Sequence, residues 1–294
     1  MRKVLLASTA LFALGSVQAM AADISISGAT EIVLDMGDSA TADQSDLEIE
    51  HDIAITFSNT TDSGISMSMV YGINDAAAVD DAETTISGDF GEFRFTQAGD
   101  EHALNDVDIE GGATAEETFT RTTNAHLAAI GGLGNNHVTY VLPSLIDGLY
   151  VAGSAANGTG DNGEASSYGV RYSMNGITAV YGQLKEQTRT VTHTGLAASF
   201  GDIGVQFAKN TDNGTGDNSG TLIGLTYAMG DITLGYESEA LENGTAAEDE
   251  KHTSIGATYA IAPGLTASLT MSESDVIDAN TDTAYTSIGL TASF

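Results

Sequence analysis

The 294-residue sequence contains no cysteine or tryptophan, only two prolines, and nine basic residues against 41 acidic ones. Without cysteine, neither a disulfide framework nor a thiolate metal site can form. The formal net charge of −32 excludes nucleic-acid binding, because phosphate contacts need a basic surface. Beyond the N-terminal segment, no apolar run approaches the about 20 residues that a membrane-spanning helix requires. Hydropathy alone would therefore class the rest of the chain as soluble.

The N-terminal segment has the pattern of a secretory signal. "MRKVLLASTALFALGSVQAMAA" combines basic Arg2 and Lys3, an apolar run, and the small-x-small sequence that ends at Ala21. It predicts a signal peptide over 1–21, cleaved after residue 21 or 22, and one domain over 22–294. An anchoring helix is the alternative, but Asp23 follows at once without a basic flank.

The remaining sequence repeats one unit, a run of alternating apolar and small polar residues followed by a turn. In "DLEIEHDIAITFS", for example, Leu47 and Ile49 alternate with Glu48, Glu50 and Asp52. Such alternation is typical of strands with two unlike faces. It predicts sixteen strands, near 24–34, 46–58, 65–74, 83–88, 92–98, 136–142, 149–155, 166–173, 176–185, 191–200, 203–209, 219–229, 231–239, 251–261, 265–273 and 284–294.

The connections alternate in length, as in an up-and-down antiparallel meander. Short turns such as Asn-Gly at 175–176 are hairpin signals. The long connections are rich in Asp, Asn, Gly and Thr, and they include 35–45 and 99–135. Charge is concentrated in these loops, whereas the second strand face is mostly small and polar. We therefore expect an all-β transmembrane barrel whose apolar face meets lipid and whose small polar face lines a lumen.

The end of the chain fits this interpretation. In "AYTSIGLTASF", Ile288, Leu290 and Phe294 share one apolar face. Because an unpaired strand edge is costly in lipid, the sheet must close, so this strand is expected to pair with "ISISGATEIVL" near the start. Tyrosines near strand ends are expected to form an interfacial aromatic girdle; they are Tyr140, Tyr172, Tyr227, Tyr236, Tyr259 and Tyr285.

Three stretches resemble the Gram-negative general porins, most closely the sixteen-stranded trimeric porins of Rhodobacter-type bacteria. "GDFGEFRFTQ" (88–97) resembles a porin turn and strand, "NNHVTYVLPSLIDGLYVAGS" (135–154) resembles a porin strand-turn-strand pattern, and Phe294 matches the terminal aromatic residue. The sequence departs from the family where Thr96-Gln97 replaces Gly-Arg and where Thr139 occupies a frequent arginine position. A strong basic wall is therefore not implied.

The resemblance implies short periplasmic turns, long extracellular loops, and a third long loop, here 99–135, folded into the pore. Acids in a narrow pore attract cations, so its carboxylates predict a cation-preferring constriction; a solvated acidic loop is the alternative. These residues are Asp100, Glu101, Asp106, Asp108, Glu110, Glu116 and Glu117. Arg94 and Arg171 should face the lumen as a basic counter-wall, and Arg121 would belong to the loop. Glu48, Glu50 and Asp52 should also line the pore, while His51 faces outward.

The resemblance also implies partners. They are outer-membrane lipid and lipopolysaccharide, two further copies in a homotrimer, and the barrel assembly machinery, for which Phe294 would be part of the signal. No cofactor is expected; Ca²⁺ at the Gly-rich acidic stretches 157–164 and 212–218 is a lesser alternative. No catalytic motif is recognisable, so no enzyme is predicted.

The leading hypothesis is an outer-membrane channel for passive diffusion of small hydrophilic solutes and ions. The alternatives are a substrate-selective outer-membrane channel and a soluble exported β-protein, such as an adhesin or a surface module.

Overall fold

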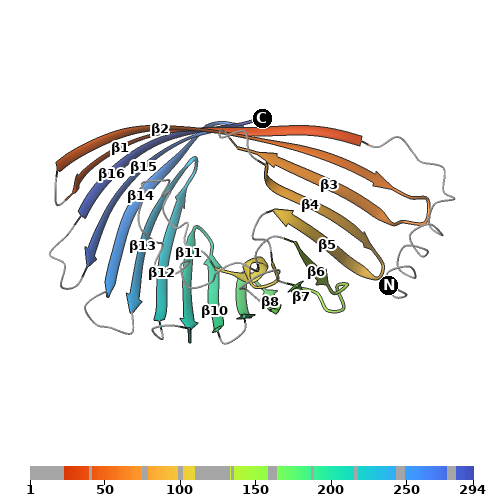
Figure 1. The fold of residues 1–294 in the computed structure, drawn as a ribbon. Helices are drawn as coiled ribbons and strands as arrows, with labels where there is room; N and C mark the ends of the chain where they lie inside the picture. The colour runs from red at the N-terminus through yellow and green to blue at the C-terminus, as the bar shows by residue number, and fades with distance from the viewer. Residues whose placement is uncertain are drawn as a thin grey trace.

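A computed structural model describes residues 23–39, 42–74, 79–98, 102–109, 133, 136–157, 164–186, 189–214, 218–242, 249–276 and 283–294. They form one closed antiparallel barrel of sixteen strands (Figure 1). The strands are β1 (Asp23–Ser39), β2 (Ala42–Thr60), β3 (Ser66–Ile73), β4 (Val79–Gly88), β5 (Gly91–Ala98), β6 (His137–Val141), β7 (Leu149–Asn157), β8 (Glu164–Met174), β9 (Ile177–Glu186), β10 (Arg189–Phe200), β11 (Ile203–Asp212), β12 (Asn218–Met229), β13 (Ile232–Glu242), β14 (Glu250–Ala262), β15 (Leu265–Val276) and β16 (Thr283–Ser293). The predicted number and type of strands are confirmed.

The first and last strands close the barrel. β16 pairs with β1 in antiparallel register, with Leu290 opposite Ile32 and Gly289 opposite Val33. Beyond the end of β16, the backbones of Phe294 and Gly28 exchange two hydrogen bonds of 2.9 and 3.0 Å. Every strand therefore has two neighbours, as closure in lipid requires.

The short connections behave as hairpins. Asn175 and Gly176 both have positive φ, 53° and 78°, which is the backbone of a type I′ turn and suits the twist of paired strands. This turn sets the register that continues up β8 and β9, where Gly169 lies opposite Gly182.

Alternation along the strands divides the barrel into two surfaces. On β11, Ile203, Val205 and Phe207 are exposed on the outer face, whereas Ala208 and Asn210 are fully buried on the inner face. The same division continues around the barrel, so most large apolar side chains point outward. This inverts the pattern of a soluble protein and matches a lipid-facing sheet.

Two predictions are wrong, one about a connection between strands and one about a tyrosine. The stretch 35–45 was predicted as a long connection, but β1 continues to Ser39 and β2 begins at Ala42, because the antiparallel ladder carries on through polar residues such as Asp35 and Asp46.

Tyr285 does not belong to an outer girdle. It lies opposite Gly37, on the inner face that it shares with Asp35 and Ser287, whereas Tyr172, Tyr227, Tyr236 and Tyr259 are exposed on the outside.

One segment lies inside the ring of strands. Residues 102–109, here called the inner segment, contain a single 3-10 turn, η1 (Asn105–Val107), seen in yellow in Figure 1. The turn contacts β8 and β9. Within the described ranges, no helix has the length and apolar character needed to cross a membrane.

Candidate functional site

The inner segment lies in a shallow seat made by glycines on the inner face of the barrel wall. A Cβ atom at Gly169 of β8 would collide with the carbonyl oxygen of Ala103, and one at Gly182 of β9 would collide with Leu104. Leu104 and Val107 are consequently buried, with 0% and 1% of their surface exposed. The missing side chains on the wall thus allow the segment to lie directly against the sheet.

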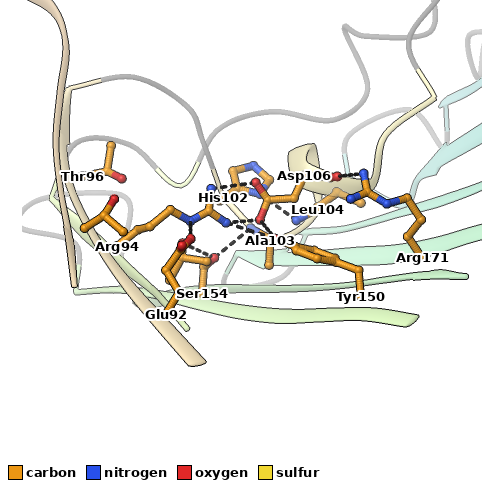
Figure 2. A network of polar contacts seen from close by, with 12 residues as sticks. Glu92, Arg94, Thr96, His102, Ala103, Leu104, Asp106, Tyr150, Ser154 and Arg171 are labelled. Carbon is orange, nitrogen blue, oxygen red and sulfur yellow. Dashed lines mark hydrogen bonds and ion pairs between the residues drawn. The ribbon is translucent and has the colours of Figure 1, made fainter. Parts of the chain in front are cut away.

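Arg94 of β5 binds the middle of the inner segment. Its guanidinium contacts both carboxylate oxygens of Asp106, with Nη1 2.9 Å from Oδ1 and Nη2 in contact with Oδ2. The Tyr150 hydroxyl, on β7, donates to the same Oδ2 at 2.5 Å, and Glu92 lies 3.5 Å from Arg94 Nε. Figure 2 shows these groups converging on Asp106. Bidentate pairing of this kind is directional as well as attractive, so it fixes the segment on the wall.

Arg171 of β8 also contacts the inner segment. Its Nη1 donates to the backbone carbonyl of Asp106 at 3.1 Å, and its guanidinium carbon lies 4.9 Å from the centre of the Tyr150 ring. Arg94 and Arg171 were predicted to face the lumen as a basic counter-wall to the acidic loop. Both lie on the inner face in contact with that loop, and their positive charge is directed at Asp106.

A neutral hydrogen-bond chain holds the start of the segment. The Ala103 N–H donates to Ser154 Oγ at 2.8 Å, and Ser154 Oγ lies 2.7 Å from Thr139 Oγ1. Thr139 is completely buried. At this position, where the resemblance noted in the sequence implied an arginine, the chain therefore uses a hydroxyl group to support the loop.

The end of the inner segment contacts another part of the barrel wall, at β10. The Asp108 carboxylate lies 3.0 Å from His193 Nδ1, and the Ile109 N–H donates to His193 Nε2 at 3.1 Å. Ile109 packs with Val180, Ala208 and Leu222. The segment is therefore attached along its whole described length, from β6 and β7 to β10 and β11.

The charges on the remaining inner wall are predominantly negative. Glu48 and Glu50 lie on the inner face of β2, opposite Val33 and Glu31 of β1. Asp52 lies on the same face, and Glu31 accepts a hydrogen bond from Thr291 at 3.2 Å. No lysine or arginine occurs between Lys3 and Arg94. The wall formed by β1 to β4 consequently carries acids without any basic side chain.

Several predicted residues cannot be placed. Asp100, Glu101, Glu110, Glu116, Glu117 and Arg121 lie outside the described residues, as does the signal segment. Both calcium stretches are only partly described. In the second, Asp212 already contacts Arg189 Nε at 2.9 Å. Within the described ranges, no group of three His, Asp or Glu side chains is arranged to hold a metal ion.

The sequence did not reveal three further partners of the loop. Tyr150, Ser154 and His193 all lie on the inner face of their strands, which strand alternation alone could have indicated. Nothing in their local sequence distinguishes them from other lumen-facing polar residues, because their role depends on a segment distant in the chain.

The comparisons with known proteins agree with this architecture. A search of the curated proteins found no match. Among solved structures, the fold is similar to the anion-selective porin from Comamonas acidovorans, with a TM-score of 0.72 at 12% identity, over 93% of this chain and 100% of that one. It is also similar to a mutant of Rh. blastica porin, with a TM-score of 0.72 at 15% identity, over 92% and 100%.

A third similar structure is a loop-deletion mutant of an outer membrane protein of Vibrio cholerae, with a TM-score of 0.66 at 16% identity, over 94% of this chain and 100% of that one. At these identities the structures establish the fold alone. The family model for the Gram-negative porin matches residues 7–289, which is nearly the whole chain. Because this family model covers nearly the whole chain and the fold is a closed sixteen-stranded barrel, the chain belongs to the Gram-negative porin family.

Proposed function

We propose that this porin is a water-filled diffusion channel for small hydrophilic solutes that prefers cations. The family and the fold support an outer-membrane channel. The observation that supports cation preference is the pairing of Arg94 with Asp106. An arginine that is paired bidentately with a carboxylate contributes little net electric field to the pore. The acidic side chains elsewhere on the wall therefore dominate the potential in the lumen.

The other inward arginines support the same conclusion. Arg189 contacts both Glu186 at 3.2 Å and Asp212 at 2.9 Å, and Arg171 is directed at the Asp106 carbonyl. Meanwhile β1 and β2 present Glu31, Glu48, Glu50 and Asp52 without a lysine or arginine. Because an anion-selective porin has a similar fold, the proposed cation preference rests on these wall charges and not on the barrel fold.

The test is the reversal potential of the purified protein in a planar bilayer under a salt gradient. A potential with the sign of cation permeation is expected, and its magnitude should fall as the salt concentration rises, because salt screens the wall charges. A reversal potential of the opposite sign would remove the cation preference but leave the channel in place. Absence of conductance from correctly folded barrels would remove the channel function itself.

We also propose that the protein assembles as a homotrimer through the outer face of β1 and β2. On β1, exposed apolar residues extend from Ile24 to Met36, about 40 Å along the strand at 3.3 Å per residue. On β11 they end at Phe207, and Lys209 follows on the same face. Thr30 and His51 on the β1–β2 face bond to each other at 3.0 Å, so their polar groups already have partners before another subunit covers them.

The trimer can be tested without altering the pore. Chemical crosslinking and native mass measurement in mild detergent should give three copies, and a charged substitution at Ile49 should give monomers.

We further infer that residues 1–21 are removed on export, that Phe294 is read by the assembly machinery, and that lipopolysaccharide surrounds the outer rim. Ca²⁺ binding is the lesser proposal, and calorimetric titration of the purified protein would test it.

A further inference from the structure

His193 and Asn210 form a buried polar pair at the end of the inner segment, distant in the chain from Arg94 and its partners. The two residues lie opposite each other on β10 and β11, and each has 0% of its surface exposed. His193 Nδ1 lies 2.6 Å from Asn210 Oδ1 and 3.0 Å from Asp108 Oδ1. The Asp108 side chain is 1% exposed. A carboxylate, an amide and an imidazole therefore meet in a site almost closed to water.

The hydrogen bonds define which ring nitrogen carries the proton. The Ile109 backbone N–H donates to Nε2 at 3.1 Å, so Nε2 must be an acceptor and carry no hydrogen. The ring proton is then on Nδ1, which donates to Asn210 Oδ1 at 2.6 Å, while the Asp108 carboxylate lies beside the same nitrogen at 3.0 Å. In this arrangement His193 acts as donor on one side and acceptor on the other. An apolar residue could perform neither role.

These contacts stabilise the inner segment more than the barrel. β10 and β11 are already joined by a continuous ladder from Val191 to Phe200 and need no further link. Both groups that His193 binds from outside the sheet, Asp108 and the Ile109 N–H, belong to the segment. The Ile109 side chain also lies over Gly195, where a Cβ atom would collide with it. Backbone and side chain are thus held at the same point.

We propose that His193 is a positioning residue of the channel, which with Asn210 forms a second anchor that holds the end of the inner segment at Asp108 and Ile109. The first anchor is Arg94 with Asp106 on the opposite side of the segment. Because two separated anchors prevent the segment from pivoting about either one, His193 sets a single open conductance. This inference rests on the proposed channel function.

The experiment compares single-channel recordings of the wild type, His193→Leu, His193→Gln and Thr192→Leu. Thr192 is adjacent on β10 but lies on the outer face, so Thr192→Leu controls for a general disturbance of the strand. Wild type and Thr192→Leu should show one open level. His193→Leu should show several levels with greater open-channel noise. His193→Gln, which keeps a donor and an acceptor, should return most channels to one level.

Two measurements test the anchor independently of conduction. Heat-modifiable migration in detergent establishes that each barrel is folded. Hydrogen exchange at the Ile109 amide should then be at least about tenfold faster in His193→Leu, as expected for the loss of about 1.4 kcal/mol of protection. ¹⁵N spectra of the wild type should show the proton on Nδ1. If His193→Leu does not fold, Asn210→Ala replaces it in the single-channel recordings and in the exchange measurement.

The possible outcomes distinguish the anchoring role of His193 from the proposed channel function. If the wild type conducts and folded His193→Leu has the same open level, noise and Ile109 exchange, His193 is not an anchor. If His193→Gln resembles His193→Leu in every measurement, the donor–acceptor role is wrong. If the folded wild type does not conduct, the channel function fails, while the exchange measurement still decides whether His193 holds the segment.

Discussion

The ring of Tyr285 lies over Gly37, its cross-strand neighbour at the seam between β16 and β1, in the space where a side chain at position 37 would begin. Glycine is required there because even a methyl group would collide with the aromatic ring. The pair therefore acts as a local lock on the register in which the barrel closes.

Replacing Gly37 with alanine should weaken this seam. The Tyr285 ring would have to leave its position, and such overpacking typically costs about 1–3 kcal/mol. The expected result is a lower temperature for the loss of the folded band in heat-modifiable migration. Gly153→Ala is the matched control, since its nearest neighbour, the Ser167 carbonyl oxygen, is 3.9 Å from the added carbon. Equal stability of the two variants would show that the ring does not lock the seam.

Asp106→Asn and Arg94→Gln should shift ion selectivity in opposite directions. The first removes the carboxylate that pairs with the Arg94 guanidinium and should move the reversal potential toward anions. The second removes a positive charge and should move it toward cations. The double variant should lie near the wild type. Asp202→Asn, in an exposed short turn, is the control for loss of one acid, and a shift as large as that of Asp106→Asn would contradict the assignment.

Ser154→Ala should loosen only the start of the inner segment. The Ala103 N–H would lose its acceptor in a buried position, which costs about 1–3 kcal/mol. Hydrogen exchange at Ala103 should therefore accelerate by about five-fold or more, while thermal stability of the barrel stays close to that of the wild type. Exchange at Ile109 provides the internal comparison and should change little; uniform acceleration along 102–109 would indicate one cooperative unit instead.

Deleting Phe294 should reduce assembly more than conduction. The deletion removes the two backbone bonds to Gly28 and the ring that lies against this glycine. The amount of folded barrel in the outer membrane should fall, whereas the channels that do assemble should keep the wild-type conductance. Phe294→Tyr keeps the ring and should assemble normally. Normal membrane levels of the deletion variant would exclude Phe294 from the assembly signal.

The barrel could be predicted from the sequence because each strand carries its own pattern. Alternation in "DLEIEHDIAITFS" places Glu48 and Leu47 on opposite faces without knowledge of any other strand. The same rule, applied to the last strand, would have placed Tyr285 on the inner face with Ser287. The interfacial prediction failed because it used distance from the strand end instead of alternation.

The inner segment could not be predicted in the same way. Its seat depends on glycines of β8 and β9 that happen to lie opposite each other, and its anchors come from β5, β6, β7, β8, β10 and β11. The sequence indicated that Arg94 faces inward, but not that Asp106 would reach it. Contacts between a loop and a distant wall carry no local period, so only the closed barrel reveals them.

The direct bond between Arg94 and Asp106 makes the width of the passage and its charge depend on the same atoms. A substitution that frees the arginine to act on permeating ions also releases the segment that narrows the lumen. Under the proposed channel function, a change of ion selectivity made at Arg94 alone should therefore also alter the size limit of the channel. Variation that changes one property and spares the other is expected at wall acids that do not touch the segment, such as Glu48.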